Sequence, residues 1–486
     1  MSEIKNIQPT EVWSVFDQML QIPRPSKHEA QIQDWAVKFG KDLGLETIKD
    51  EVGNVIIKKP ATPGMENRKT IVMQGHLDMV PQKNSDKKHD FQADPIEAYV
   101  DGDWVTANGT TLGADNGIGV SAAMAVLASK TLKHGPVEVL LTATEETGMD
   151  GANGLKGGLL DADILINTDS EDEGELYVGC AGGEDANITF SYTEDEVPVG
   201  FIALKLSVTG MKGGHSGMDI IRGRGNAIKT FFRIINAANN LGVRLASIDG
   251  GSLRNAIPRE AFGVLVVEEA KAADFIALVE EISSDVKAEL SATEPDMNIA
   301  VEAAELPAAL IDAETQAKVT AAIVACPNGV IRMSDSMEGL VETSTNLALF
   351  KSDAESKTIN GGCLMRSSVD TAKAELASRL KAVFELAGAE ITFTGTYPGW
   401  KPNMDSPILK TMQNVYNDKW GKIPKIMAIH AGLECGILAQ NYPHWDMISF
   451  GPTIRFPHSP DEKVNIETVE KFWEFLKLTL ENIPLK

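Results

Sequence analysis

The chain has 486 residues and a formal net charge of −24, and its length favours two to four domains. An apolar fraction of 43% supports a buried core and excludes a disordered chain, while the negative charge disfavours nucleic acid and anionic membranes as partners. No run of about 18 apolar residues occurs, so no transmembrane helix is predicted.

The N-terminal sequence MSEIKNIQPTEVW lacks the apolar segment and cleavage site of a signal peptide. The four cysteines have no CxxC spacing, which indicates neither a disulfide framework nor a thiolate zinc site. Buried, reduced thiols in a cytoplasmic protein are the expectation. These cysteines are Cys180, Cys326, Cys363 and Cys435.

Two helices are predicted at the N-terminal end of the chain. The first is capped by Thr10 and ends at the Pro23-Arg24-Pro25 break. The second begins at Ser26-Lys27-His28-Glu29, which has capping-box spacing, and stops near Gly44.

An α/β pattern follows, with short β-branched segments that do not alternate in polarity. Thr70–Gly75, Val137–Ala143 and Ile164–Thr168 are typical of strands buried on both faces, and Ile118–Ser129 is a small-residue helix. We therefore expect a parallel or mostly parallel sheet with helices packed on it.

From about Asn187 the pattern changes to α+β, with two successions of the β-α-β-β-α-β type. The first contains strands Ala203–Val208 and Phe262–Val267 and helices Asn226–Asn239 and Ala272–Leu290. The second contains helices Ala313–Val324 and Thr371–Leu386 and strands Glu342–Phe350, Lys357–Arg366 and Glu390–Gly395. These successions predict a second domain built from two similar halves.

The turn-rich segment Thr396–Pro407 is interpreted as a return to the first domain. Strands Lys425–Ile429 and Met447–Phe450 and a long helix from Ile466 resume the α/β pattern. The prediction is a catalytic α/β domain at 1–186 and 400–486, interrupted by an inserted domain at 187–399.

Acidic residues and histidines stand just after predicted strands or at a helix start, where open α/β sheets bind ligands. In His76-x-Asp78 the imidazole can bind a metal while the carboxylate orients it or a neighbouring catalytic group. Asp115 opens a helix, where its carboxylate can bridge two cations.

Three further signals complete this pattern. Glu145 and Glu146 are adjacent acids after a buried strand, so one can ligate a metal while the other carries protons. Asp169 ends ILINT, and His458 lies in the PHSP loop. Two histidines with carboxylates suit zinc, cobalt or manganese in a pair that shares one bridging carboxylate.

Each residue alone has a simpler explanation, since acids after strands often cap helices or occupy solvated turns. Capping explains Asp115, but it does not explain His76-x-Asp78 together with Glu145-Glu146. The combination favours a metal centre.

The motifs GHLDMV, GADNG, TEETGMDGA, NTDSED and PHSPDE resemble the two-zinc metallopeptidase family of bacterial dipeptidases, carnosinases, aminoacylases and glutamate carboxypeptidases. The resemblance spans nearly the whole chain, and the chain's length, GGHSG and HAGLECG are closest to the family's bacterial dipeptidases. It implies two divalent ions, with zinc first and cobalt or manganese as alternatives. One ion would take His76 and Asp169, the other Glu146 and His458, and Asp115 would bridge them.

The same resemblance assigns Glu145 as general base, Asp78 as the residue that orients His76, and a cis peptide bond after Asp115. It makes the inserted domain a lid whose closure completes the site. Its implied substrate-binding residues are His215, Asn255, Arg366 and Gly432, with weaker indications for His430 and Glu434.

The implied function is hydrolysis of unblocked dipeptides, Xaa-His among them, with small peptides as substrates. An N-acyl amino-acid deacylase, a tripeptidase or a carboxypeptidase of the same family is the alternative. A metal-stabilised binding protein would have no use for Glu145 beside the ligand Glu146, and a purely structural role predicts no stoichiometric metal. The sequence leaves open a monomer or a homodimer, and whether His215 serves its own site or a neighbour's.

Overall fold

The computed structural model describes residues 3–486, and the chain divides into two compact units. Unit 1 comprises the chain up to Cys180 together with Trp400–Ala428 and Leu433–Lys486. Unit 2 comprises Ala181–Gly399 and the short segment Ile429–Gly432.

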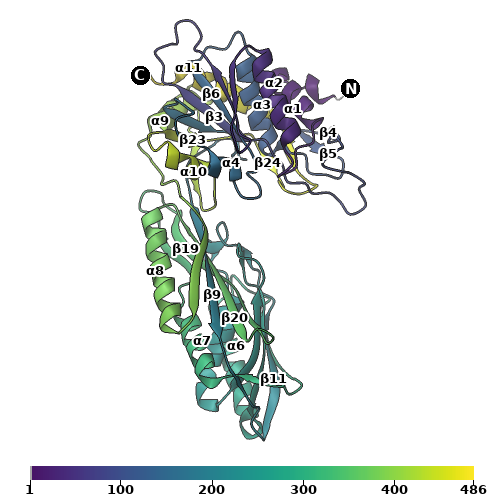
Figure 1. The fold of residues 1–486 in the computed structure, drawn as a ribbon, viewed down its shortest axis with the longest axis vertical. Coiled ribbons are helices and arrows are strands. Elements are labelled where there is room, and N and C mark those ends of the chain that lie inside the picture. The colour runs from purple at the N-terminus through teal and green to yellow at the C-terminus, as the bar shows by residue number, and fades with distance from the viewer. Residues whose placement is uncertain (1–2) are drawn as a thin grey trace. The chain divides into compact units, whose positions relative to one another are not determined.

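Unit 1 contains an eight-stranded sheet in the order β1-β2-β6-β3-β7-β23-β8-β22 (Figure 1). β6, β3, β7 and β23 run parallel, whereas β1, β2 and β8 pair antiparallel with their neighbours. In sheet order the strands are Glu46–Lys49, Val55–Lys59, Val137–Thr142, Ile71–His76, Ile164–Asn167, Asp446–Ser449, Glu175–Cys180 and Lys425–Ile429.

The central strands β3, β6 and β7 are buried along their whole length, which is the reason for their continuous apolar sequence. α1 packs on α3 and α3 on β3, while α9 packs on α11 and β23 (Figure 1). This confirms the predicted α/β fold. The helices of the unit are α1 Thr10–Leu20, α2 Ala30–Asp42, α3 Ala114–Ala128, α4 Asp150–Gly154, α9 Pro407–Trp420, α10 Glu434–Asn441 and α11 Ile466–Asn482.

A smaller antiparallel sheet, β24-β25-β5-β4, completes unit 1 and positions the loop of His458. Its strands are Ile454–Arg455, Lys463–Asn465, Trp104–Ala107 and Ala98–Asp101.

The predicted caps of the first two helices were wrong. Pro9 precedes α1, and Thr10 is its first residue and makes no cap. α2 begins at Ala30. The hydroxyl of Ser26 donates to Asp78, and Glu29 accepts from Thr144 and from the amide of Lys27, not from that of Ser26. Contacts with distant segments therefore displaced the local capping interaction.

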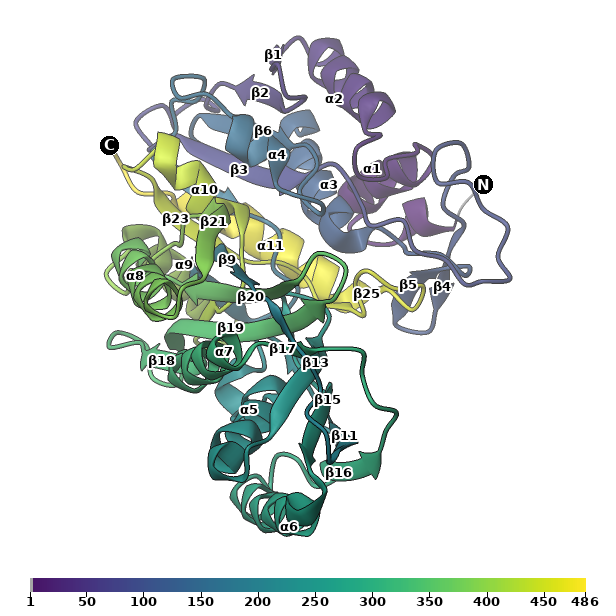
Figure 2. The same ribbon diagram turned by 60° about the horizontal axis from the view of Figure 1, so that its bottom comes forward.

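Unit 2 is built on a single sheet in the order β16-β11-β15-β13-β19-β20-β9-β21, with β18 paired to β19 (Figure 2). In that order the strands are Asn298–Ala303, Phe201–Thr209, Ala261–Glu268, Arg244–Gly251, Val341–Asp353, Thr358–Ser367, Gly182–Ser191 and Glu390–Tyr397, with β18 at Gly329–Met333. Two short pairs accompany it: β10 Glu194–Asp195 with β17 Leu310–Ile311, and β12 Gly214–His215 with β14 Ala256–Ile257.

The two predicted halves meet where β13 pairs with β19. In the first half the chain runs β11-α5-β13-β15-α6-β16, and in the second it runs α7-β19-β20-α8-β21. The second half takes its first strand, β9, from a segment before the whole first half, and β9 pairs with β20 and β21. The sequence did not identify this strand.

Helices α5, α6, α7 and α8 cover one face of the sheet in unit 2 (Figure 2). The core lies between that face and the helices and contains Phe190, Phe232, Phe350 and Phe384, whose rings contact one another edge to face. The helices are α5 Ala227–Ala237, α6 Ala272–Glu289, α7 Ala313–Ala325 and α8 Asp370–Leu386.

Within residues 3–486, none of the helices combines the length and the apolar character needed to cross a membrane.

Candidate metal centre

Four sequence-predicted residues lie at one edge of the parallel sheet in unit 1. His76 is the last residue of β3, Glu145 and Glu146 follow β6, and Asp169 follows β7. Parallel strands that end at the same edge bring these side chains together although they are far apart in the sequence.

Asp115 lies between the two histidines. Its Oδ1 is 3.1 Å from Nε2 of His76, and its Oδ2 is 3.2 Å from Nε2 of His458. His76 Nε2 is also 3.3 Å from Asp169 Oδ1, and His458 Nε2 is 2.9 Å from Glu146 Oε2. One carboxylate thus contacts two imidazoles, each of which has a second carboxylate of its own.

Among residues 3–486, three groups of side chains have donor atoms close enough to hold a cation. Two of them share Asp115 and contain the residues that the family resemblance assigns to each ion. The third brings Glu145 into reach of His76. The groups are His76-Asp115-Asp169, Asp115-Glu146-His458 and His76-Glu145-Glu146.

The backbone around Asp115 is unusual, as the resemblance implied. The Asp115–Asn116 peptide bond is cis, and these two residues depart from helical dihedral angles inside α3. Asn116 Nδ2 donates a hydrogen bond of 2.6 Å to the carbonyl of Thr168, which ties this loop to the end of β7. Gly75 leaves room for it, since a Cβ there would lie 2.2 Å from Asn116 Oδ1.

Asp78 organises both His76 and the turn of the two glutamates. Its Oδ1 lies 3.4 Å from His76 Nδ1 and accepts a hydrogen bond of 2.9 Å from the amide of Glu145. Its Oδ2 accepts from the amide of Glu146 at 3.2 Å and from the hydroxyl of Ser26 at 2.8 Å. The carboxylate is fully buried, so these contacts fix its orientation.

The sequence analysis missed two buried charged residues that hold the loop before Asp115. Arg24 donates to the carbonyls of Leu77 and Asp78 at 3.0 and 3.1 Å and to that of Gly113 at 2.5 Å. Glu462 accepts hydrogen bonds from backbone amides of the same loop. In the sequence, Arg24 is part of the helix-breaking segment Pro23-Arg24-Pro25, and Glu462 is one acid in a loop. Neither residue therefore has a local pattern that indicates its role.

Glu434 lies beneath the ligands in a buried polar network. Its Oε2 accepts from Gln74 Nε2 at 2.6 Å and Thr142 Oγ1 at 2.7 Å, and burial raises its pKa to about 7. Gln74 in turn accepts from Asn167 at 2.6 Å. This network joins α10 to β3, β6 and β7, near the ends of these strands where the candidate ligands lie.

The electrostatics of the centre are dominated by closely packed acids. Burial raises the pKa of Asp169 to about 7 and raises that of Glu145 well above its usual range. Burial opposes protonation of His76, but Asp169 and its other carboxylate partners outweigh that effect and raise its pKa. Hydrogen bonds to Asp115 and Glu146 raise the pKa of His458 to about 11.

These residues fit divalent cations. Glu146 Oε1 is buried and accepts no hydrogen bond from any residue of the described range 3–486, and Asp169 Oδ1 is buried with the 3.3 Å ion pair to His76 but no hydrogen bond; such acceptors are costly to leave unsatisfied. Positive ions at this position would satisfy both oxygens and offset the repulsion among the carboxylates. Imidazole nitrogen and carboxylate oxygen together suit zinc, cobalt and manganese.

The remaining predicted residues belong to unit 2. His215 Nδ1 accepts hydrogen bonds from the amides of Gly217 and Met218 at 3.2 and 3.1 Å. An amide can only donate, so the neutral ring carries its proton on Nε2. Burial, together with Arg366, lowers the pKa of His215. The ring is therefore a neutral donor suited to an oxyanion.

Asn255 is brought close to His215 by the pairing of β12 with β14. The carbonyl of Asn255 accepts a hydrogen bond of 2.8 Å from the amide of Ser216, and Ala256 pairs directly with His215. The Asn255 side chain itself is exposed.

Arg366 is 6% exposed and has no carboxylate within ion-pair distance among residues 3–486. Its Nη1 donates to Tyr397 at 3.2 Å, and its Nε lies 3.4 Å from Ser216 Oγ. A buried guanidinium without a carboxylate partner is suited to bind one from a ligand.

His430 and Gly432 lie in the segment Ile429–Gly432, which belongs to unit 2 although its neighbours in sequence do not. His430 Nε2 is 2.7 Å from Ser344 Oγ, and burial lowers its pKa to about 3. The carbonyl of His430 would lie 2.1 Å from a Cβ at Gly217, so His430 packs against the turn that holds His215.

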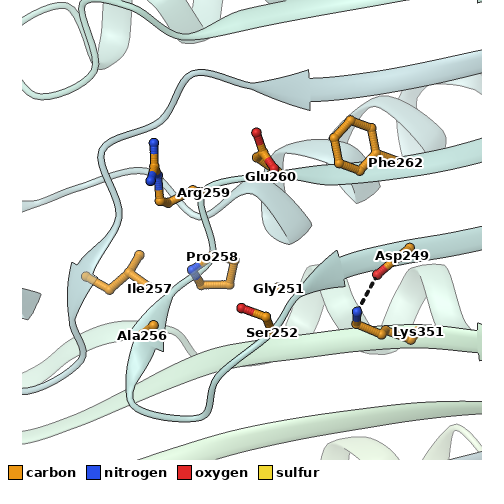
Figure 3. A pocket seen from close by; sticks show the side chains of 10 residues that line it. All are labelled: Asp249, Gly251, Ser252, Ala256, Ile257, Pro258, Arg259, Glu260, Phe262 and Lys351. Atoms are coloured by element: carbon orange, nitrogen blue, oxygen red, sulfur yellow. Dashed lines mark ion pairs between the residues drawn. The ribbon is translucent and has the colours of Figure 1, made fainter. Parts of the chain in front are cut away.

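A pocket of about 430 Å³ adjoins the β12–β14 pair in unit 2 (Figure 3). Asp249 and Lys351 form an ion pair of 2.8 Å across one side, and Arg259 and Glu260 line the other. Arg259, which lines the pocket, donates to the carbonyl of Met211 and so ties the residues after β14 to the glycine-rich segment before His215.

The fold and the candidate ligands together define a metallopeptidase-like protein, and comparison with known sequences identifies the family. Residues 72–482 match the model of peptidase family M20/M25/M40, and the chain belongs to this family of hydrolases.

The chain is 47% identical over 487 aligned residues to the cytosol non-specific dipeptidase of Escherichia coli, with all of both chains covered. It is 51% identical to the crystal structure of aminoacylhistidine dipeptidase from Vibrio alginolyticus, with a TM-score of 0.95 and coverage of 100% and 99%. The aminopeptidase PepT of Bacillus cereus shares the fold, at 18% identity, a TM-score of 0.62 and coverage of 98% and 99%.

Proposed function

We propose that this peptidase hydrolyses unblocked dipeptides, Xaa-His among them, at a pair of divalent cations, with zinc first and cobalt or manganese as alternatives. The proposal rests on the position of Asp115 between the two histidines. Its carboxylate oxygens lie 3.1 Å from Nε2 of His76 and 3.2 Å from Nε2 of His458. Full-length similarity to two proteins named as dipeptidases supports the substrate class, and the name of the Escherichia coli relative supports a cytoplasmic location.

Bound cations of this kind polarise the scissile carbonyl and lower the pKa of a coordinated water. His76, Asp169, Glu146 and His458 would hold them, and Asp115 would bridge them. Glu145 is the proposed base, because its carboxylate makes no hydrogen bond or ion pair with any other residue in the described range 3–486. It would take the proton of the attacking water and deliver it to the leaving amine.

The residues of unit 2 are proposed to bind the substrate. His215 would donate a hydrogen bond from its Nε2–H group to the developing oxyanion, and Asn255 would be a second donor. Each well-placed hydrogen bond would stabilise the transition state by about 3–4 kcal/mol. Arg366 would bind the terminal carboxylate of the dipeptide, and Gly432 would offer its backbone amide.

A panel of four substrates tests the proposal: an Xaa-His dipeptide, its C-terminal amide, a tripeptide and an N-acetyl amino acid. Each is assayed with metal removed and with zinc, cobalt or manganese restored. The free dipeptide should be cleaved fastest, and only with metal present. Faster cleavage of the N-acetyl compound would indicate a deacylase, and faster cleavage of the tripeptide would indicate a tripeptidase or carboxypeptidase.

A further inference from the structure

Glu462 lies in the loop that carries His458, and its carboxylate binds the loop that carries Asp115. Oε2 accepts hydrogen bonds from the amides of Leu112 and Gly113 at 2.7 and 2.8 Å, and Oε1 accepts from the amide of Asp115 at 3.2 Å. Glu462 is 2% exposed. One buried carboxylate therefore holds three amides of the segment that ends at Asp115.

The backbone of Glu462 is fixed to the loop of His458. Its amide donates to the carbonyl of Ser459 at 3.0 Å, and its carbonyl accepts from Thr106 Oγ1 at 2.8 Å. β25 begins at the next residue and pairs with β5. The turn after His458 thus ends at Glu462. A displacement of the Glu462 backbone would therefore also displace the loop of His458.

Both loops supply residues to the same candidate group, Asp115-Glu146-His458. Metal–ligand distances vary by only about 0.2 Å, so the separation of these two loops sets how well the group fits a cation. Among residues 3–486 the hydrogen bonds of its carboxylate are those with the three amides, and the buried guanidinium of Arg24 adds a longer-range attraction.

We propose that Glu462 is a positioning residue that sets the separation of Asp115 and His458, and thereby the cation affinity of the group they share. This role rests on the proposed metal-dependent function. Glu462 belongs to none of the candidate ligand groups found among residues 3–486, and it would act through the three amides it binds.

Glu462→Gln is the informative variant. Its side-chain oxygen can still accept from Leu112 and Gly113, but its NH2 group then faces the amide of Asp115, donor against donor. Glu138→Gln is the control, because Glu138 is also a buried carboxylate that accepts from a backbone amide, that of Asp161 at 3.0 and 3.1 Å; the substitution also weakens its 3.0 Å ion pair with Lys58. Glu138 lies near the start of β6, at the other end of the strand from Glu145.

The zinc affinity of each full-length protein is measured by competition with a chelator, after circular dichroism has shown that the metal-free protein is folded. Glu462→Gln should weaken zinc binding at Asp115-Glu146-His458 by roughly ten- to a hundredfold, and weaken the other site, which shares Asp115 but not the His458 loop, by less. Glu138→Gln should change neither. Saturating zinc should restore most of kcat in Glu462→Gln, with KM for the dipeptide unchanged.

Two wild-type zinc affinities in folded Glu462→Gln would overturn the positioning role. If that variant does not fold, Glu462→Asp keeps the charge but shortens the reach, and it must weaken the site of Asp115, Glu146 and His458 more than the other. A wild-type protein that binds no zinc would overturn both this role and the proposed function. A wild-type protein that binds two zinc ions without cleaving dipeptides would overturn the proposed substrate alone.

Discussion

Asp78 accepts a hydrogen bond of 2.9 Å from the backbone amide of Glu145, so the residue that orients His76 also fixes the proposed base. Its other oxygen accepts from the amide of Glu146 at 3.2 Å. A single carboxylate thus connects the end of β3 with the turn after β6.

Asp78→Asn should lower kcat by roughly ten- to a hundredfold at saturating zinc, a typical cost for residues that orient metal ligands. An asparagine keeps one acceptor and turns an NH2 group toward amides that can only donate. Ser26→Ala removes one hydrogen bond to Asp78, worth about 1 kcal/mol, and should cost no more than about fivefold. An Asp78→Asn rate within twofold of wild type would show that the orientation does not matter.

Glu145→Gln should abolish nearly all turnover while two metals stay bound. The amide is isosteric but cannot accept a proton, and general-base contributions are at least about a hundredfold. Metal content by elemental analysis and kcat on a dipeptide are the two measurements. A variant that kept a tenth of the wild-type rate would exclude Glu145 as the base.

The α/β pattern of unit 1 was readable because buried parallel strands and amphipathic helices leave strong signals in sequence. Helix α11 and strand β22 begin where the pattern placed them, at Ile466 and Lys425. The candidate ligands were recognisable in combination, because several histidines and acids follow strands of one sheet, at the edge where open α/β sheets bind ligands.

The residues that sequence reasoning missed act through contacts between distant segments. Ser26 and Glu29 have the spacing of a capping box, but their side chains bind Asp78 and Thr144. Arg24 and Glu462 lie in ordinary loops, and only the folded chain brings both to the segment before Asp115. Such partners, separated by 50 to 350 residues, leave no local pattern.

Gly119→Ala should destabilise the protein although alanine favours helices. A Cβ at Gly119 would lie 2.4 Å from Thr168 Oγ1 and 2.6 Å from the Thr168 carbonyl, which also anchors Asn116. Overpacking of this kind costs about 1–3 kcal/mol, measurable by urea unfolding. Gly157→Ala is the control, because the nearest atom to its Cβ would be 3.7 Å away. Equal stability of the two variants would contradict the close packing of α3 against Thr168.

His430 should make stability fall in mild acid. Burial lowers its folded-state pKa to about 3, whereas an unfolded histidine titrates near pH 6.5. The contribution of neutral His430 to the free energy of unfolding is therefore present above about pH 6.5 and is lost as the pH falls toward 3. The reason is that the unfolded chain binds the proton at a higher pH than the folded chain does.

At pH 5.5 this effect amounts to about 1.4 kcal/mol relative to pH 8. His430→Gln keeps a partner for Ser344 without titrating, so its unfolding free energy should fall less over this range by that amount. Parallel pH dependences in the two proteins would show that His430 titrates normally when folded.

Arg366 should set the requirement for a free substrate carboxylate. If it pairs with that group, amidation of an Xaa-His dipeptide should cost about 2–5 kcal/mol in the wild-type protein, because the buried guanidinium is left unpaired. That corresponds to a fall in kcat/KM of roughly thirty- to several-thousandfold.

The variant Arg366→Met separates this interaction from a general loss of activity. Methionine fills part of the same space without charge, so the variant should cleave the free dipeptide poorly and no longer distinguish it from the amide. The four values of kcat/KM form a double-mutant cycle, in which the coupling energy should be close to the wild-type cost of amidation. Ser216→Ala, which removes only the 3.4 Å contact to Arg366 Nε, should keep most of the discrimination. If Arg366→Met still preferred the free acid as strongly as wild type, the carboxylate would be bound elsewhere, and a carboxylate-binding role for Arg366 would have to be abandoned.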